Sequence, residues 1–211
     1  MAGIFYGWIG VYYGDLAQMV DTWAYHFESL KETALLKANP LKFISDLFSN
    51  SYINGYANFF SNENSWWNDL KSNFFIKILA IFNLLSFGNY YINVIFYSFF
   101  SLFGPIAVFR VMKDLYPSKK VQILAGCFLI PSFLYWTSGI HKEGIIFSAI
   151  ALIIYQVYFG LKQRKFSFLR ILLIFIGLIL ILALRNFLII PLIPALIAWI
   201  LSDYLKNKYA P

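Results

Sequence analysis

FSFLRILLIFIGLILILALRNFLIIPLIPALIAWILS, residues 166–202, is the longest apolar run of the chain and indicates its fold class most directly. A helix needs about 20 apolar residues to cross a hydrocarbon core about 30 Å thick, so this stretch is too long for one span. It divides at Arg185-Asn186 into two predicted helices, and the second contains Pro191 and Pro194. The stretch therefore predicts an integral membrane protein built of helices.

Three more segments approach the length of a span, at 90–112, 121–138 and 144–161. The composition agrees, because 60% of the 211 residues are hydrophobic and 13% are charged, whereas a soluble domain is about half apolar and about a quarter charged. The interior of so short a chain is too small to bury that much apolar surface. We predict an all-α, polytopic transmembrane protein in which residues 1–211 form a single domain, with about five spans in 90–211.

Residues 3–13 are apolar but too short to cross a membrane, and no basic stretch precedes them as in a signal peptide. Residues 1–14 are therefore predicted to be the outer remnant of a first span whose start is missing, in a chain that is a fragment of a longer protein.

The basic residues cluster in three places that are separated by pairs of predicted spans. Ten of the 17 basic residues lie there: Arg110, Lys113, Lys119, Lys120, Lys162, Arg164, Lys165, Arg170, Lys206 and Lys208. By the positive-inside rule these three places are cytoplasmic. The turns at 139–143 and 185–186 then face outward, and so do residues 15–89.

Residues 15–89 form the predicted external segment, which carries seven of the ten acidic residues. Apolar residues recur at helical spacing in 16–37, at Leu16, Met19, Val20, Trp23, Phe27 and Leu30, and more briefly in 41–48. Both segments are predicted to be amphipathic helices on the membrane surface. Residues 74–88 are predicted to be an interfacial or re-entrant helix, and the Asn- and Ser-rich stretch 50–68 is predicted to be a loop.

Two carboxylates on the outer side are candidate catalytic residues. Asp15 follows an apolar run in the sequence Tyr13-Gly14-Asp15, and Asp21 comes six residues later. A carboxylate there can accept a proton from a hydroxyl or bind a divalent metal. The alternative role of Asp15 is to cap the helix expected to begin at Leu16.

His141-Lys142-Glu143 and Arg185 are the other candidates, because charges at membrane depth cost several kcal/mol unless they are paired or hydrated. Pro131 must bend or interrupt its span, and the hydrogen-bonding residues that follow suit a polar cavity better than lipid. The guanidinium of Arg185 has the forked geometry that grips a phosphate. The alternatives are that Lys142 and Glu143 neutralise each other in a turn and that Arg185 reaches lipid headgroups.

Several classes of protein are excluded or disfavoured by the sequence. The basic residues lie between apolar runs, so the net charge of +7 does not indicate a nucleic-acid partner. The single cysteine, Cys127, rules out an internal disulfide. Two histidines without an HExxH motif disfavour a zinc enzyme. No cofactor is expected, although a divalent metal at Asp15 stays open.

Residues 131–144, PSFLYWTSGIHKEG, resemble a segment of polytopic bacterial membrane proteins of the GT-C glycosyltransferase type. These include relatives of the protein mannosyltransferases and of the lipid A aminoarabinose transferases. Tyr13-Gly14-Asp15 lies where this superfamily has an acidic residue in its first external loop. The resemblance implies that Asp15 is the catalytic base, with Asp21 in reserve. It also implies that the substrate is bound by His141, Lys142, Glu143 and Arg185.

The substrate implied by this resemblance is a polyprenyl-phosphate sugar, and the acceptor is an envelope glycan or lipid at the bacterial inner membrane. Lys142 or Arg185 would hold the phosphate that leaves, and membrane lipids are the other expected partners. Three alternatives stay open. Polysaccharide polymerases share the segment, a transporter or flippase component would also use broken helices and buried charges, and a membrane scaffold would need no active site.

Overall fold

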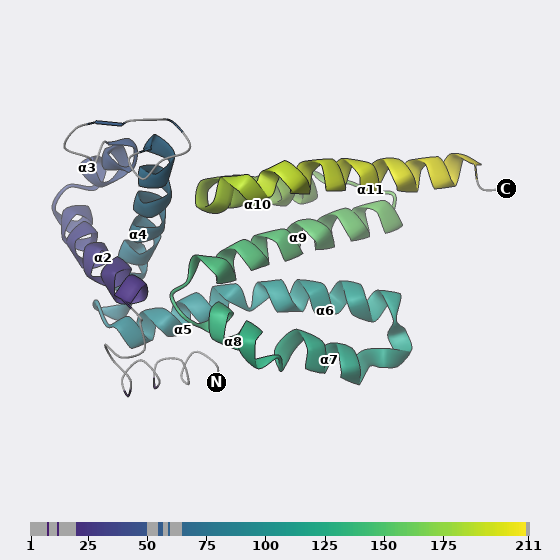
Figure 1. Cartoon of the computed structure of the whole chain (residues 1–211), viewed down its shortest axis with the longest axis horizontal. Helices are drawn as coiled ribbons and strands as arrows, with labels where there is room; N and C mark the ends of the chain where they lie inside the picture. The colour runs from purple at the N-terminus through teal and green to yellow at the C-terminus, as the bar shows by residue number, and fades with distance from the viewer. Residues whose placement is uncertain are drawn as a thin grey trace. The chain divides into compact units, whose positions relative to one another are not determined.

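The computed structural model describes residues 8, 12, 20–49, 55–56, 59 and 65–209. Helices make up the elements of this described part, and no β-strand is among them (Figure 1). The predicted all-α class is therefore confirmed. Three helical stretches are long and apolar enough to cross a membrane, as expected of a membrane protein: Tyr90–Leu115, Lys142–Lys162 and Phe168–Leu205.

The chain divides into two compact units. The first comprises residues 1–100 and 131–144, and the second comprises residues 101–130 and 145–211. Two of the three boundaries between the units, at 100/101 and 144/145, fall inside helical stretches that are long enough to cross a membrane.

The first unit contains α2 (Val20–Ala38), α3 (Pro40–Ser45), η2 (Asp46–Phe48), α4 (Trp66–Ser86), α5 (Tyr90–Ser101) and α8 (Pro131–Ser138). The helices predicted over 16–37 and 41–48 correspond to α2 and to α3 with η2. The helix predicted over 74–88 begins earlier, at Trp66, because the Ser65 side chain caps it by accepting a hydrogen bond from the Asn68 backbone N–H. The last residues of the predicted loop over 50–68 are therefore helical.

The face that α2 packs against the rest of the first unit is polar. Thr22, His26, Ser29 and Thr33 recur every three or four residues and are all buried, whereas Phe27 is 56% exposed. An amphipathic helix on the membrane surface would turn these polar residues toward water. In the structure they are buried instead, and they form hydrogen bonds with residues of α4 and α5. Burial of such groups is tolerated where they are paired across helices.

The second unit contains α6 (Phe103–Leu115), η3 (Pro117–Lys119), α7 (Lys120–Phe128), most of α9 (Lys142–Lys162), α10 (Phe168–Arg185), η4 (Asn186–Leu188) and α11 (Ile189–Tyr209). Its core is a cluster of Ala149, Ile153 and Val157 from α9 with Ile181 from α10. Phe175 and Ile190 are among many large apolar side chains exposed on α10 and α11. A bilayer solvates such a surface, as water does not.

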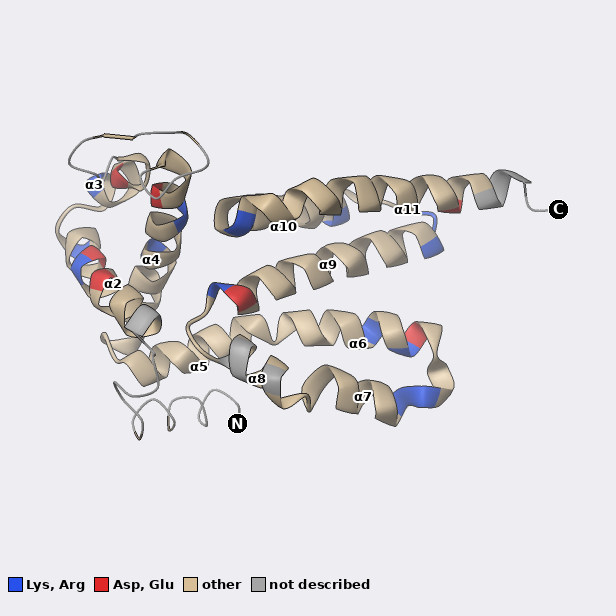
Figure 2. Cartoon of the chain, in the orientation of Figure 1, with Lys and Arg blue, Asp and Glu red and all other residues tan. Residues whose placement is uncertain are grey.

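The stretch 166–202 divides at Arg185-Asn186, as the sequence predicted, into α10 and α11. The two helices form a hairpin, because Arg164, just before α10, makes an ion pair with Asp203 near the end of α11. A second ion pair joins Lys162 at the end of α9 to Asp114 near the end of α6. Basic residues therefore gather at one end of this unit (Figure 2).

The span predicted over 121–138 is interrupted just before Pro131, as Pro131 indicated. This segment forms two short helices, α7 and α8, which are separated at Leu129 and Ile130. Pro131 lacks a backbone N–H and so cannot donate the hydrogen bond that would continue α7; instead it begins α8. Neither helix approaches the length of a span.

Candidate functional site

Lys142 is the candidate site residue whose surroundings are most distinctive. It is the first residue of α9, and its ammonium nitrogen lies 4.6 Å from the ring centre of Tyr25 and 5.6 Å from that of Phe75. Both distances are within the range of cation–π attraction. Among the ion pairs formed by described residues, none involves Lys142. Within the described part of the chain, its positive charge is therefore held by aromatic rings.

The rings beneath Lys142 belong to a packed aromatic cluster in the first unit. Tyr25 meets Phe75 edge-on at 5.2 Å between ring centres, and Phe75 meets Tyr97 edge-on at 6.1 Å. Phe75 and Tyr97 are fully buried. The Tyr97 hydroxyl donates a hydrogen bond to the backbone carbonyl of His141. This bond ties the turn before α9 to α5, so the position of Lys142 is set by buried neighbours.

A buried polar network joins α2, α4 and α5. The Asn83 amide donates to the hydroxyls of Ser29 at 2.9 Å and Thr33 at 3.1 Å, and its carbonyl accepts from the Asn93 amide at 2.6 Å. Further along the same interface, the Tyr90 hydroxyl donates to that of Thr22 at 3.0 Å. These side chains give the first unit a hydrogen-bonded interior.

His26 belongs to the same network and is 3% exposed. Its Nδ1 lies 3.5 Å from the Asn93 amide nitrogen. Burial lowers the pKa of His26, and a hydrogen bond with the Gly88 backbone opposes that shift. The neutral imidazole is thus favoured, and it can accept a hydrogen bond from Asn93.

The other predicted site residues lie in different parts of the chain, and the structure describes all of them except Asp15. Asp15 lies outside the described residues, whereas Asp21 lies in the first turn of α2. Glu143 follows Lys142 in the first turn of α9. Arg185 ends α10 in the second unit, where its guanidinium lies 5.9 Å from the Phe187 ring. A shared cavity for Asp15, Lys142 and Arg185 stays a prediction.

Two groups of interacting polar residues were not predicted from the sequence. One is the buried network around Asn83, which the regular spacing of Thr22, His26, Ser29 and Thr33 could have indicated. The other is Asp114, which accepts hydrogen bonds from Tyr158 at 2.6 Å and from Lys162. No cluster of three or more His, Cys, Asp or Glu suited to a metal occurs within the described residues.

An ammonium group placed this way can hold an anion. Lys142 keeps N–H donors beyond its contacts with the rings, and it lies at the N-terminus of a 21-residue helix, where the helix dipole favours negative charge. In comparisons with known proteins, no family model, curated protein or solved structure matches the chain.

Proposed function

We propose that the chain is a multi-pass protein of the bacterial inner membrane that transfers a sugar from a polyprenyl-phosphate donor to an envelope glycan or lipid. The observation that supports this most is Lys142, whose ammonium lies over Tyr25 and Phe75. A cation at a helix N-terminus is disfavoured by the helix dipole when the site is empty, whereas a bound phosphate would be attracted by both. The resemblance of residues 131–144 to GT-C glycosyltransferases points to the same class of substrate.

In the proposed reaction the hydroxyl oxygen of the acceptor attacks the anomeric carbon of the donor sugar. The bond from that carbon to the phosphate oxygen breaks, and its electron pair leaves with the polyprenyl phosphate. The hydroxyl proton passes to the carboxylate of Asp15, with Asp21 as the alternative base. Lys142 or Arg185 stabilises the negative charge of the leaving phosphate, while His141 and Glu143 also bind the substrate.

The proposal is tested by sugar transfer in proteoliposomes supplied with a set of polyprenyl-phosphate hexoses. Asp15→Asn or Asp21→Asn is expected to lower the rate about 10²–10⁴-fold, the usual contribution of a general base. Membrane abundance should be unchanged, because Asn keeps an oxygen that can cap a helix.

Lys142→Gln is expected to weaken donor binding, and Lys37→Gln, on an exposed part of α2, is the matched control.

Wild-type rates in both aspartate variants would leave the transferase without its base. Movement of the donor across the bilayer without transfer would assign the chain to the flippases. If the chain neither transferred the sugar nor moved the donor across the bilayer, the scaffold alternative would remain.

A further inference from the structure

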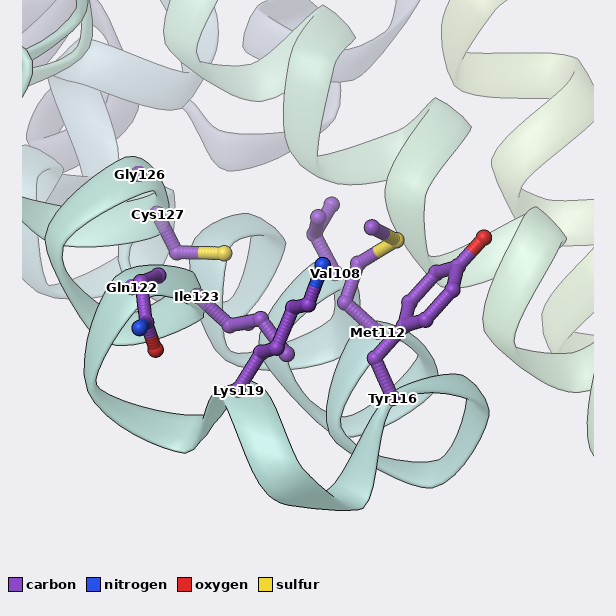
Figure 3. Close-up of a pocket in the computed structure, with 8 residues that line it drawn as sticks. All are labelled: Val108, Met112, Tyr116, Lys119, Gln122, Ile123, Gly126 and Cys127. Atoms are coloured by element: carbon purple, nitrogen blue, oxygen red, sulfur yellow. The ribbon is translucent and has the colours of Figure 1, made fainter.

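A groove of about 490 Å³ lies between α6 and α7 in the second unit (Figure 3). Apolar side chains form much of its wall, including Val108 and Met112 from α6 and Ile123 from α7. Its volume is within the range of about 300–1,000 Å³ that is typical of small-molecule sites. Lys119, in η3, is the one charged residue among the described residues that line it.

The charged group of the groove lies at one end, and the residues along its length are mostly apolar, with Gln122 of α7 as a polar exception. Lys119 lies at the turn between the two helices, and in Figure 3 its amine is directed toward the space between Ile123 and Met112. Gly126 and Cys127 line the groove about two helical turns further along α7, which is roughly 10 Å at 1.5 Å per residue. A Cβ atom added at Gly126 would meet nothing within 4 Å, so this part is open. The shape and polarity suit a ligand with a charged head and an apolar chain.

The charge at the head end is positive and is not neutralised nearby. Lys113 and Lys120 flank the groove in the sequence, and the ion pairs among described residues include neither of them, nor Lys119. The neighbouring acid, Asp114, already accepts hydrogen bonds from Tyr158 and Lys162. Lysines at a membrane surface attract anionic lipid headgroups.

We propose that this groove binds an anionic phospholipid, with its phosphate on Lys119 and an acyl chain along Ile123 toward Gly126. Charge complementarity selects this occupant over a zwitterionic lipid, and the apolar walls select a lipid over free phosphate. The proposal does not rest on sugar transfer, because none of the candidate catalytic or substrate-binding residues lines the groove.

The native thiol provides the test, because Cys127 is the single cysteine of the chain and lines the groove. The purified full chain is placed in mixed micelles with phosphatidylglycerol or with phosphatidylcholine, and alkylation of Cys127 by N-ethylmaleimide is timed. Phosphatidylglycerol is expected to slow alkylation several-fold relative to phosphatidylcholine. Lys119→Gln should remove this difference, and Lys119→Arg should restore it. Lys120→Gln removes the same charge beside the groove, and this variant should keep most of the difference between the two lipids.

Native mass spectrometry provides a second readout that does not use the thiol. Wild type should retain phosphatidylglycerol, and Gly126→Leu, which fills the open part of the groove, should retain at least one molecule fewer. Equal protection by the two lipids would overturn the proposal. An equal loss of the protection by phosphatidylglycerol in Lys119→Gln and Lys120→Gln would also overturn it, because the lipid would then be attracted by the general positive charge and not by Lys119. Protection that follows protein concentration and not lipid would show that a second copy of the chain covers the groove.

Discussion

At the level of single residues, Asn83 joins three helices of the first unit through hydrogen bonds of its side-chain amide. It is 2% exposed, and its one amide group joins Ser29 and Thr33 of α2 to Asn93 of α5. Removing one partner from such a network leaves the others buried without hydrogen bonds. Asn83→Ala is therefore expected to lower the free energy of unfolding by roughly 1–3 kcal/mol, measured by SDS titration in mixed micelles.

The matched control for this prediction is Asn73→Ala on the same helix. Asn73 is half-buried, and its amide nitrogen lies 3.5 Å from a carboxylate oxygen of Asp69 on the same helix. Its loss is expected to change stability by much less than the loss of Asn83. Equal effects of the two substitutions would mean that the Asn83 network does not hold α2, α4 and α5 together.

At the scale of the helices, close packing in the second unit depends on small residues. A Cβ atom added at Gly177 of α10 would lie 2.9 Å from Cγ1 of Ile153 on α9, an atom too near the backbone to swing away. Glycine at such contacts lets membrane helices approach closely. Gly177→Ala is therefore expected to destabilise the packing of α9 on α10, by roughly 1–3 kcal/mol for an overpacked core.

Gly126 provides the opposite case for the same measurement, thermal unfolding in detergent. It lies inside α7, and an added Cβ atom would meet nothing within 4 Å. Because alanine is favoured over glycine in a helix by about 1 kcal/mol, Gly126→Ala should be neutral or stabilising. A stabilised Gly177→Ala variant would show that α9 and α10 are not in close contact at this point.

At the scale of the whole molecule, the basic clusters set a prediction for topology. The ion pairs Lys162–Asp114 and Arg164–Asp203 bring the ends of α6, α9 and α11 to one end of the second unit. By the positive-inside rule this end is predicted to face the cytoplasm. Cysteines placed at Ser118, Ser167 and Asn207, in a Cys127→Ser background, are expected to react with an impermeant thiol reagent only after the membrane is opened.

A cysteine at Lys37 is the outward-facing control, since residues 15–89 are predicted to be external. It should react in intact cells. External labelling at any of the three cytoplasmic positions would overturn the predicted orientation, while failure to label Lys37→Cys would place α2 elsewhere.

Much of the helical architecture follows from residues that are close in the sequence. The length of the apolar run 166–202 and the polar pair Arg185-Asn186 predicted α10 and α11, because a bilayer accepts only segments whose backbone hydrogen bonds are satisfied internally. Pro131 indicated an interruption, but local hydropathy alone treated 121–138 as one span. The hydropathy of a segment does not reveal whether its helix is continuous.

The helical class and the apolar character of the chain follow from composition and short-range spacing alone. Which face of α2 is buried depends on distant segments, because Thr22 bonds to Tyr90, and Ser29 bonds to Asn83, across more than 50 residues. Tertiary packing also brings together Lys142, Tyr25 and Phe75 from three separate segments. A polar side chain can be buried only where a partner meets it, and that meeting is a property of packed helices and not of any one of them.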